Sequence, residues 1–375
     1  MIRKPFALFA ALLTCLLVST TARADIDLTD DGVLKAYADL RLRWESDFNS
    51  TAPSGAERRD RDRFRVRARV GFKYLPVDEL LVNLRIRYGA QDSQQSPHTT
   101  IWQDHGDAGI QDQFVIDRFF AKIKLDDRWS MTIGRDGLAI WKPNELLWDD
   151  DVYVDGLSFS FRDKHNEMDY ALNFGAGVLP DGEDDRELAE RAVFGFGQLY
   201  TEQQLTAAKL IIAQSVLYLQ DNSAHSNMVV DDLNFLISYT NIQFAFDVTD
   251  GLPLTLGGDL MYNFADGKNS DHRNDKVGGV VYVTLGKLKQ PGDWLLGYYF
   301  AYIEKWAVPR FFAQDDWHRF GSATQTRSSD FFGHEIRAAY VCRENVQLMA
   351  RFYVVDTITN REDGMRFRFD VNISF

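Results

Sequence analysis

The segment 60–74, DRDRFRVRARVGFKY, alternates between apolar and cationic residues. From Phe64 onward, apolar or aromatic side chains hold every even position, and arginine or lysine holds most odd positions. A period of two places these two sets on opposite faces of a β-strand, whereas a helical period of 3.6 would scatter the arginines around the whole cylinder. The segment is therefore predicted to be a strand with one apolar face and one cationic face.

The same alternation recurs along the chain and predicts about 16 strands. These cover residues 33–48, 60–74, 80–90, 114–125, 129–135, 152–162, 168–177, 191–200, 205–219, 233–248, 254–265, 277–287, 294–306, 332–341, 346–356 and 365–375. In 205–219 the alternation is weak, and a helix is not excluded there. In 233–248 the apolar phase changes between Tyr239 and Ile242, which predicts a β-bulge or two strands in place of one.

The connections between the predicted strands alternate between short and long. Tight turns at 75–79, 126–128, 163–166 and 290–293 alternate with long polar segments such as 91–112, 136–151 and 309–330. This asymmetry and an even strand number are typical of a transmembrane antiparallel β-barrel, with short periplasmic turns and long extracellular loops. The last strand alternates up to Phe375, which resembles the C-terminal signal of outer-membrane barrel proteins. We therefore expect an all-β fold, with residues 25–375 forming a single barrel domain.

Residues 1–24 have the features of a cleaved signal peptide. Arg3 and Lys4 form a basic start, 6–18 is an apolar run too short to span a bilayer as a helix, and Ala22-Arg23-Ala24 is an A-x-A cleavage site. Cleavage would change the net charge from −13 to −16, because three basic residues and no acid are lost. Such an acidic chain is a poor candidate for general nucleic-acid binding.

Cysteine usage excludes a disulfide-stapled scaffold. Cys15 would leave with the leader, so Cys342 would have no intrachain partner. No apolar run after the leader approaches the roughly 20 residues that a membrane helix needs. A barrel has this composition because its apolar residues alternate with polar ones.

The segment 60–74 resembles the early strands of the putative-porin family of bacterial outer-membrane proteins. The later motifs Gly134-Arg135, Trp141-Lys142-Pro143, LWDDDV at 147–152 and Asp155-Gly156-Leu157 share this resemblance. It covers roughly residues 35–160, and it implies a porin barrel related to alginate-export barrels. Alginate-export barrels are longer and have more strands. The resemblance implies a channel and does not name a solute.

The predicted strands carry a large set of arginines on their polar face. An arginine facing lipid at the bilayer midplane costs about 2–4 kcal/mol, so these side chains are expected to face water inside the barrel. Closure places the last strand beside the first, which joins pore-lining residues from both ends of the sequence into one cationic sector: Arg41, Arg43, Arg63, Arg65, Arg67, Arg69, Arg85, Arg87, Arg351, Arg366 and Arg368, extended by Arg337 if 332–341 has the same phase. Two interpretations remain open, namely solute selectivity and simple solvation of the lumen.

Acidic residues are available to balance this sector. Asp39 and Glu45 lie within it, and the third long connection carries Glu145, Asp149, Asp150 and Asp151. In general porins the third loop folds into the lumen, and we expect the same here: a constriction loop carrying these four acids opposite a basic wall, with a field across the pore. The Asp149–Asp151 run lacks the spaced ligands and glycine turn of a calcium loop, so no metal site is predicted.

Catalytic motifs are weak. The chain has no HExxH or paired-cysteine zinc motif and no phosphate-binding glycine loop. His225-Ser226-Asn227 and Asp104-His105 contain residue types of a hydrolase site. However, adjacent residues on a loop do not usually face one another, and loops are rich in these types. We therefore predict that the chain is not an enzyme and has no catalytic residues and no cofactor.

Together these features favour an outer-membrane porin for passive or facilitated diffusion of small hydrophilic solutes, with arginines that favour anions. Two alternatives remain: a channel that exports or binds an acidic polysaccharide such as alginate, and an outer-membrane barrel hydrolase. The expected location is the bacterial outer membrane, reached after secretion across the inner membrane. Expected partners are lipid and lipopolysaccharide, polar or anionic solutes, and the barrel-assembly machinery acting through the strand that ends in Phe375. A homotrimer is left open.

Overall fold

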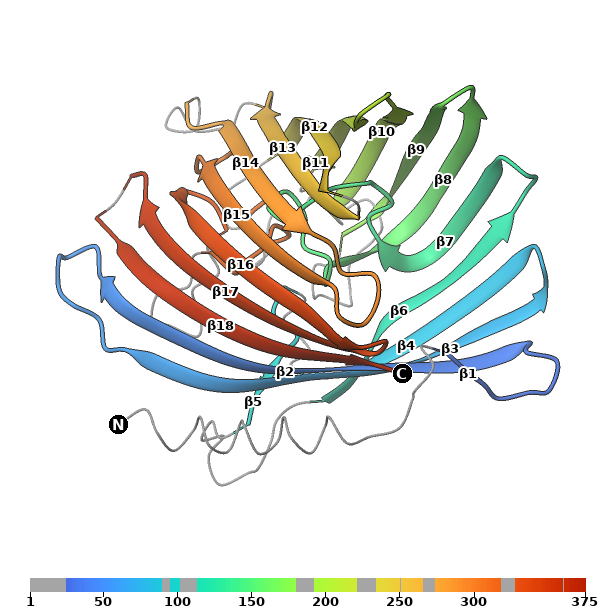
Figure 1. The fold of residues 1–375 in the computed structure, drawn as a ribbon, viewed down its shortest axis with the longest axis horizontal. Coiled ribbons are helices and arrows are strands. Elements are labelled where there is room, and N and C mark those ends of the chain that lie inside the picture. Colours follow the sequence, from blue (N-terminus) through green and yellow to red (C-terminus); the bar gives the residue numbers. More distant parts are fainter. Residues whose placement is uncertain are drawn as a thin grey trace.

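The chain forms a closed antiparallel β-barrel of 16 strands (Figure 1). The computed structural model describes residues 25–89, 95–101, 113–179, 192–220, 234–249, 251–265, 274–317, 328–359 and 361–375. Within these ranges no helix is long and apolar enough to cross a membrane. The all-β barrel and the strand number predicted from the alternation are confirmed.

The barrel strands follow one another around the wall in chain order. They are β2 (Leu34–Thr51), β3 (Arg61–Val77), β4 (Leu80–Gly89), β6 (Gln113–Lys124), β7 (Trp129–Gly137), β8 (Tyr153–His165), β9 (Met168–Val178), β10 (Val193–Gln204), β11 (Lys209–Gln220), β12 (Phe235–Thr249), β13 (Leu252–Asn263), β14 (Val277–Gly286), β15 (Trp294–Ile303), β16 (Phe331–Arg343), β17 (Val346–Thr357) and β18 (Asp363–Ser374). Two short strands, β1 (Ile26–Asp27) and β5 (Thr99–Thr100), pair with β2 and β3.

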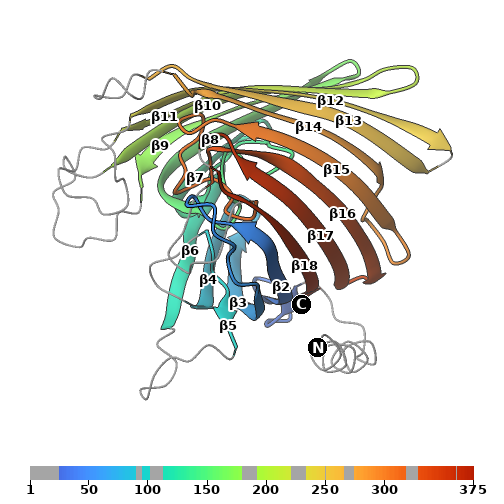
Figure 2. The ribbon, with the colours of Figure 1, turned by 90° about the vertical axis from the view of Figure 1, so that its left-hand side faces the viewer.

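The barrel closes where β18 pairs with β2 (Figure 2). Asp370 lies opposite Arg43 in this register, and the backbone groups of Phe375 and Ala38 exchange hydrogen bonds of 2.8 and 3.1 Å. Closure leaves no free sheet edge, which a membrane-spanning sheet requires because lipid cannot satisfy backbone hydrogen bonds. It also brings polar side chains from the two ends of the sequence together.

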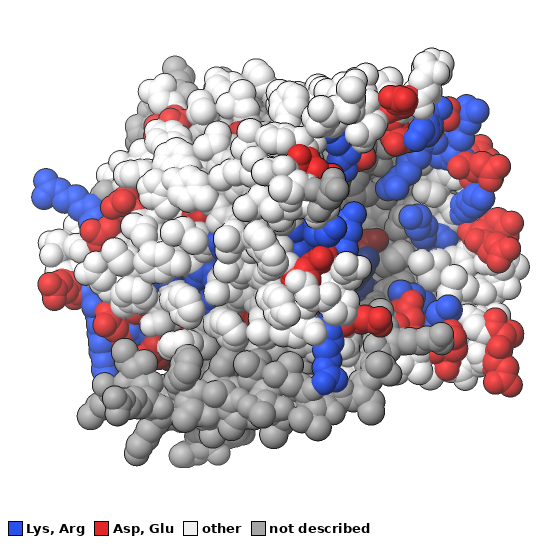
Figure 3. Space-filling view, in the orientation of Figure 1, with Lys and Arg blue, Asp and Glu red and all other residues white. Residues whose placement is uncertain are grey.

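The strands present large apolar side chains on the outside of the barrel. Leu260, Leu296 and Ile133 are examples, each at least half exposed. The two sequence neighbours of Leu260, Asp259 and Met261, point inward and are buried. This alternation gives a lipid-facing surface. Figure 3 shows a largely uncharged side of the barrel, with charged residues gathered toward the end that carries the short turns.

The strand β12 corrects one expectation. It is a single strand, and its pairing with β11 and β13 is regular from Tyr239 to Ile242, so neither a bulge nor a strand boundary lies there. The phase changes because Tyr239 points inward and is buried, whereas Ile242 points outward. Residues 209–220 likewise form a strand, β11, whose alternation is weak because both of its faces are apolar.

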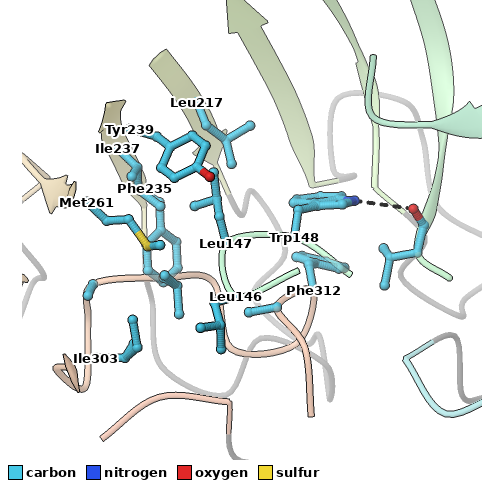
Figure 4. Close-up of a cluster of buried hydrophobic side chains, with 14 of the residues drawn as sticks. Leu146, Leu147, Trp148, Leu217, Phe235, Ile237, Tyr239, Met261, Ile303 and Phe312 are labelled. Carbon is cyan, nitrogen blue, oxygen red and sulfur yellow. Dashed lines mark hydrogen bonds between the residues drawn. The ribbon is translucent and has the colours of Figure 1, made fainter. Parts of the chain in front are cut away.

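The apolar inward faces pack against chain segments that enter the lumen. Loop 138–152 connects β7 to β8, and segment 306–317 follows β15. Leu146, Leu147 and Trp148 of the loop are nearly fully buried against inward side chains of β11 to β15 (Figure 4). The core of this protein therefore lies inside the barrel and fills part of its lumen.

Candidate pore-lining site

The predicted arginines lie in one continuous sector of the barrel wall. Cross-strand register places several of them directly opposite one another: Arg43 with Arg65, Arg41 with Arg67, Arg69 with Arg87, and Arg351 with Arg368. We call the predicted set, including Arg337 opposite Arg351, the arginine sector. Like charges that lie directly opposite one another destabilise a sheet. This arrangement therefore requires anionic groups between the guanidinium groups.

Acids on the strands supply part of this compensation. Asp39 accepts from Arg67 at 3.1 Å and from Arg69 at 2.7 Å. Glu45 binds Arg63 and lies 2.7 Å from Arg368. The partners Asp39 and Glu45, which sequence reasoning proposed, are thus placed among the arginines. Further contacts come from three acids that it did not name: Asp370 with Arg43 at 2.6 Å, Asp47 with Arg366 at 2.5 Å, and Asp117 with Arg85 at 2.9 Å.

Loop 138–152 adds a carboxylate from inside the lumen. Asp151 accepts hydrogen bonds from Arg67 at 2.8 Å and from Arg69 at 2.7 Å. Burial alone would raise the pKa of Asp151, but the two guanidinium groups outweigh it and hold that pKa well below its usual value. Asp151 therefore stays ionised and ties the loop to β3.

The other acids of this loop have different surroundings. Asp149 is buried, and burial followed by the charges of Glu145 and Asp151 raises its pKa well above the usual value. Asp150 is largely exposed and binds Lys142. Glu145 accepts from the Gln314 side chain at 2.9 Å. The three consecutive aspartates thus point to different surroundings and do not converge as a calcium site would require.

Loop 138–152 and segment 306–317 hold one another inside the barrel. The rings of Trp148 and Phe312 stack with centroids 5.1 Å apart. The Asp149 backbone N–H donates to the Phe312 carbonyl at 2.7 Å, and the Gln314 N–H donates to the Glu145 carbonyl at 3.0 Å. On the opposite wall, Asn144 donates to Asp259 of β13. The loop therefore crosses the lumen from the arginine sector to β13.

Segment 306–317 corrects the expectation that the arginines face open water. Its Asp316 binds Arg368, lies 3.3 Å from Arg351 and 4.0 Å from Arg43, and its carbonyl accepts from Arg366 at 2.8 Å. These contacts leave Arg368, Arg366 and Arg43 only 1, 2 and 4% exposed.

The alternation pattern predicts residues 309–330 only as a connection between strands. The signal that could have revealed the inward segment is its composition: PRFFAQDDW at 309–317 is rich in aromatic residues and carries an acidic pair, like LWDDD at 147–151.

The remaining arginines differ in how they are covered. Arg65 is buried, and it donates to the Ser96 hydroxyl at 2.7 Å and to the His98 carbonyl at 3.2 Å. Arg87 is also buried. Arg41 is only partly buried, and its contact is with the Asn372 side-chain oxygen at 2.6 Å. Arg41 thus keeps partial exposure to the lumen, and Asp370 and Asp151 act on its charge without forming a direct ion pair with it in the described part of the structure.

A small water-accessible cavity remains between loop 138–152 and the wall of β15 to β17. Its volume is about 80 Å³, and its lining carries both signs of charge: Lys142, Arg337 and Arg351 with Glu145, Asp150 and Glu335. Arg337 lies over the ring of Tyr299, 4.4 Å from its centroid. Burial, and then the charge of Asp150, raises the pKa of Glu145 to about 7.

The candidate hydrolase residues 104–105 and 225–227 lie outside the described part of the chain.

Solved structures with the same fold are outer-membrane proteins. OprB of Pseudomonas putida at high pH is 9% identical with a TM-score of 0.60, over 92% of this chain and 95% of that one. OmpF of Salmonella typhi in complex with daunomycin is 10% identical with a TM-score of 0.54, over 94% and 100%. A loop L8 deletion mutant of OmpT, an outer membrane protein of Vibrio cholerae, is 12% identical with a TM-score of 0.50, over 91% and 99%. No curated protein matches the sequence.

A family described as putative porin matches residues 33–211. This range begins at the start of β2, includes the arginine-rich strand β3 and loop 138–152, and ends within β11. The family match and the barrel fold together place the chain in the bacterial outer membrane. Over residues 33–211 the chain is similar to the putative-porin family, and its fold is that of outer-membrane porin barrels.

Proposed function

We propose that the chain is a channel for passive or facilitated diffusion of small hydrophilic solutes across the outer membrane, with a preference for anions. The observation that carries the preference is the excess of arginines over acids along one wall of a closed barrel. Among these arginines, Arg41 is expected to contribute most to the anion preference. Its side chain is partly exposed, and it donates a hydrogen bond to a neutral amide oxygen, that of Asn372. A charged lumen wall sets the local potential even when the whole chain is acidic.

Loop 138–152 is proposed to be the constriction, with Glu145, Asp149, Asp150 and Asp151 on its inner path. It crosses the lumen and is held at both ends, by Asp151 on β3 and by Asn144 on β13. Its contacts with segment 306–317 fill the apolar part of the lumen. Solutes are then limited to small ones that pass beside the loop.

The proposal is tested by the conductance of the refolded protein in planar bilayers, with the reversal potential measured in a potassium chloride gradient. Anion preference is expected, and it should decrease in Arg41→Gln. A matched control is Arg128→Gln in a short turn, where the arginine is 63% exposed and paired with Asp163. Cation preference in the wild-type protein, or equal shifts in both variants, would refute the arginine sector as the source of selectivity.

Export of an acidic polysaccharide such as alginate is less well supported. A polymer would need an exposed basic track along the pore, whereas segment 306–317 covers the arginines of β17 and β18. The match to a porin family also supports a channel rather than an enzyme, including a barrel hydrolase.

The remaining expectations stay predictions. Cleavage after Ala24 can be checked by the mass of the mature protein. Assembly through the strand ending in Phe375, contact with lipopolysaccharide, and formation of a homotrimer require measurements in native membranes.

A further inference from the structure

A second and larger cavity lies on the side of loop 138–152 that faces the short turns. Its volume is about 530 Å³, within the range of small-molecule sites. Trp141 of the loop forms part of the lining, and the rest comes from β8, β9 and β10: Arg162, Asp163, Lys164, Asp169, Tyr170, Ala171, Asn173, Tyr200 and Glu202. None of these residues belongs to the arginine sector.

Two aromatic rings form one corner of this cavity. The centroids of Trp141 and Tyr200 lie 5.3 Å apart, with an angle of 54° between the rings. The buried side chain of Gln198 makes two hydrogen bonds with the backbone of Trp141. Its amide oxygen accepts from the Trp141 N–H, and its amide nitrogen donates to the Trp141 carbonyl, each at 2.7 Å. Gln198 in turn donates to Ser215 at 2.9 Å and accepts from Asn173 at 3.3 Å. The corner is thus pre-organised, as a binding site requires.

Each carboxylate that lines the cavity is paired with a basic side chain. Lys164 lies 3.5 Å from Asp169, and Glu202 accepts from the Tyr200 hydroxyl at 2.6 Å. Glu202 also lies 3.2 Å from Lys209 of β11. Asp163 is paired outside this set, with Arg128 at 3.0 Å. Each of the three carboxylates therefore has a basic partner, so the lining offers no unpaired carboxylate that would attract a cation.

From this arrangement we infer that the cavity binds a neutral sugar ring, an inference that rests on the proposed channel function for its place on a solute path. The C–H face of a sugar packs well on aromatic rings, which provide a large apolar surface. Each sugar hydroxyl both donates and accepts a hydrogen bond, and this suits a lining that mixes guanidinium, ammonium, amide and carboxylate groups. An anionic ring would instead place its carboxylate near Asp169 and Glu202.

The test is binding of glucose to the refolded full-length protein in detergent, followed by saturation-transfer NMR. Glucuronate and glucosamine serve as the anionic and cationic counterparts. Saturable glucose binding is expected, with weaker binding of both charged sugars. Trp141→Ala should weaken glucose binding about tenfold, because the aromatic face is lost. Trp294→Ala, which removes a partly exposed tryptophan on the outer face of β15, should leave it unchanged.

Trp141→Ala could weaken binding by displacing the loop, so a second variant that leaves the loop in place is needed. Asp169→Asn keeps the shape of the cavity and leaves Lys164 without its counter-ion, so it should improve the relative binding of glucuronate. Heat-modifiable migration on gels confirms that each variant forms a barrel.

Absence of glucose binding, unchanged binding in Trp141→Ala, or a preference for glucuronate in the wild-type protein would overturn the inference. Conduction without glucose binding refutes only this site, whereas glucose binding without conduction refutes only the channel.

Discussion

Substitution of Asp151, which contacts Arg67 and Arg69, tests most directly whether loop 138–152 is attached to the arginine sector. The carboxylate lies 2.8 and 2.7 Å from the two guanidinium groups, and its side chain is 13% exposed. Asp151→Asn keeps the shape of the side chain and removes its charge. The two arginines would then retain Asp39 as their remaining carboxylate partner in this part of the structure.

The magnitude follows from Coulomb's law. At an effective dielectric constant of about 20, two unit charges about 4 Å apart interact by about 4 kcal/mol. Removing one member of a buried ion pair costs about 3–5 kcal/mol, but desolvation of the carboxylate and partial exposure reduce the net effect. We therefore expect Asp151→Asn to lower the free energy of unfolding by about 2–3 kcal/mol. Loss of a negative charge beside the arginine sector should also increase anion preference.

The neighbouring residue provides a matched control. Asp150→Asn makes the same chemical change in the same loop, but Asp150 is 69% exposed and binds Lys142. An exposed pair contributes about 0–1 kcal/mol, so stability should change little. Urea unfolding in micelles and the reversal potential in planar bilayers measure the two effects. If the two variants have the same unfolding midpoint and the same reversal potential, Asp151 does not tie the loop to the wall.

Three further predictions follow from the lumen contacts. Asp316→Asn should destabilise the barrel more than Asp150→Asn and increase conductance, because Arg43, Arg351 and Arg368 lose a shared carboxylate; equal urea midpoints would contradict this. Trp148→Ala should cost about 3–5 kcal/mol by opening an apolar cavity beside Phe312, and should raise single-channel conductance if the loop then moves.

Glu145 should give a pH effect in the wild-type protein. Because its folded-state pKa of about 7 lies above the unfolded value, the folded state holds the proton more tightly, and stability should fall as pH rises from 5 to 8. Glu145→Gln should remove this part of the pH dependence, and an unchanged slope would contradict it.

The sequence predicted the barrel because strand alternation is a local property. In segment 60–74, each residue is assigned to lipid or lumen by its position parity alone, and an arginine facing lipid is too costly to tolerate. The same parity located the arginine sector on β2, β3, β4, β17 and β18. Where the lumen face is itself apolar, as at Tyr239, parity no longer separates the two faces, and the predicted bulge was wrong.

Local sequence pattern alone is thus enough to specify the set of strands, the pattern of long and short connections, and the side of the wall on which each arginine lies. What covers those arginines depends on contacts that form only in the folded barrel. Asp151 and Asp316 reach them from two loops that are far apart in the chain, and stacking of Trp148 on Phe312 joins these loops. Such contacts depend on the complementary shapes and charges of segments far apart in the chain. The local alternation of apolar and polar residues cannot predict them.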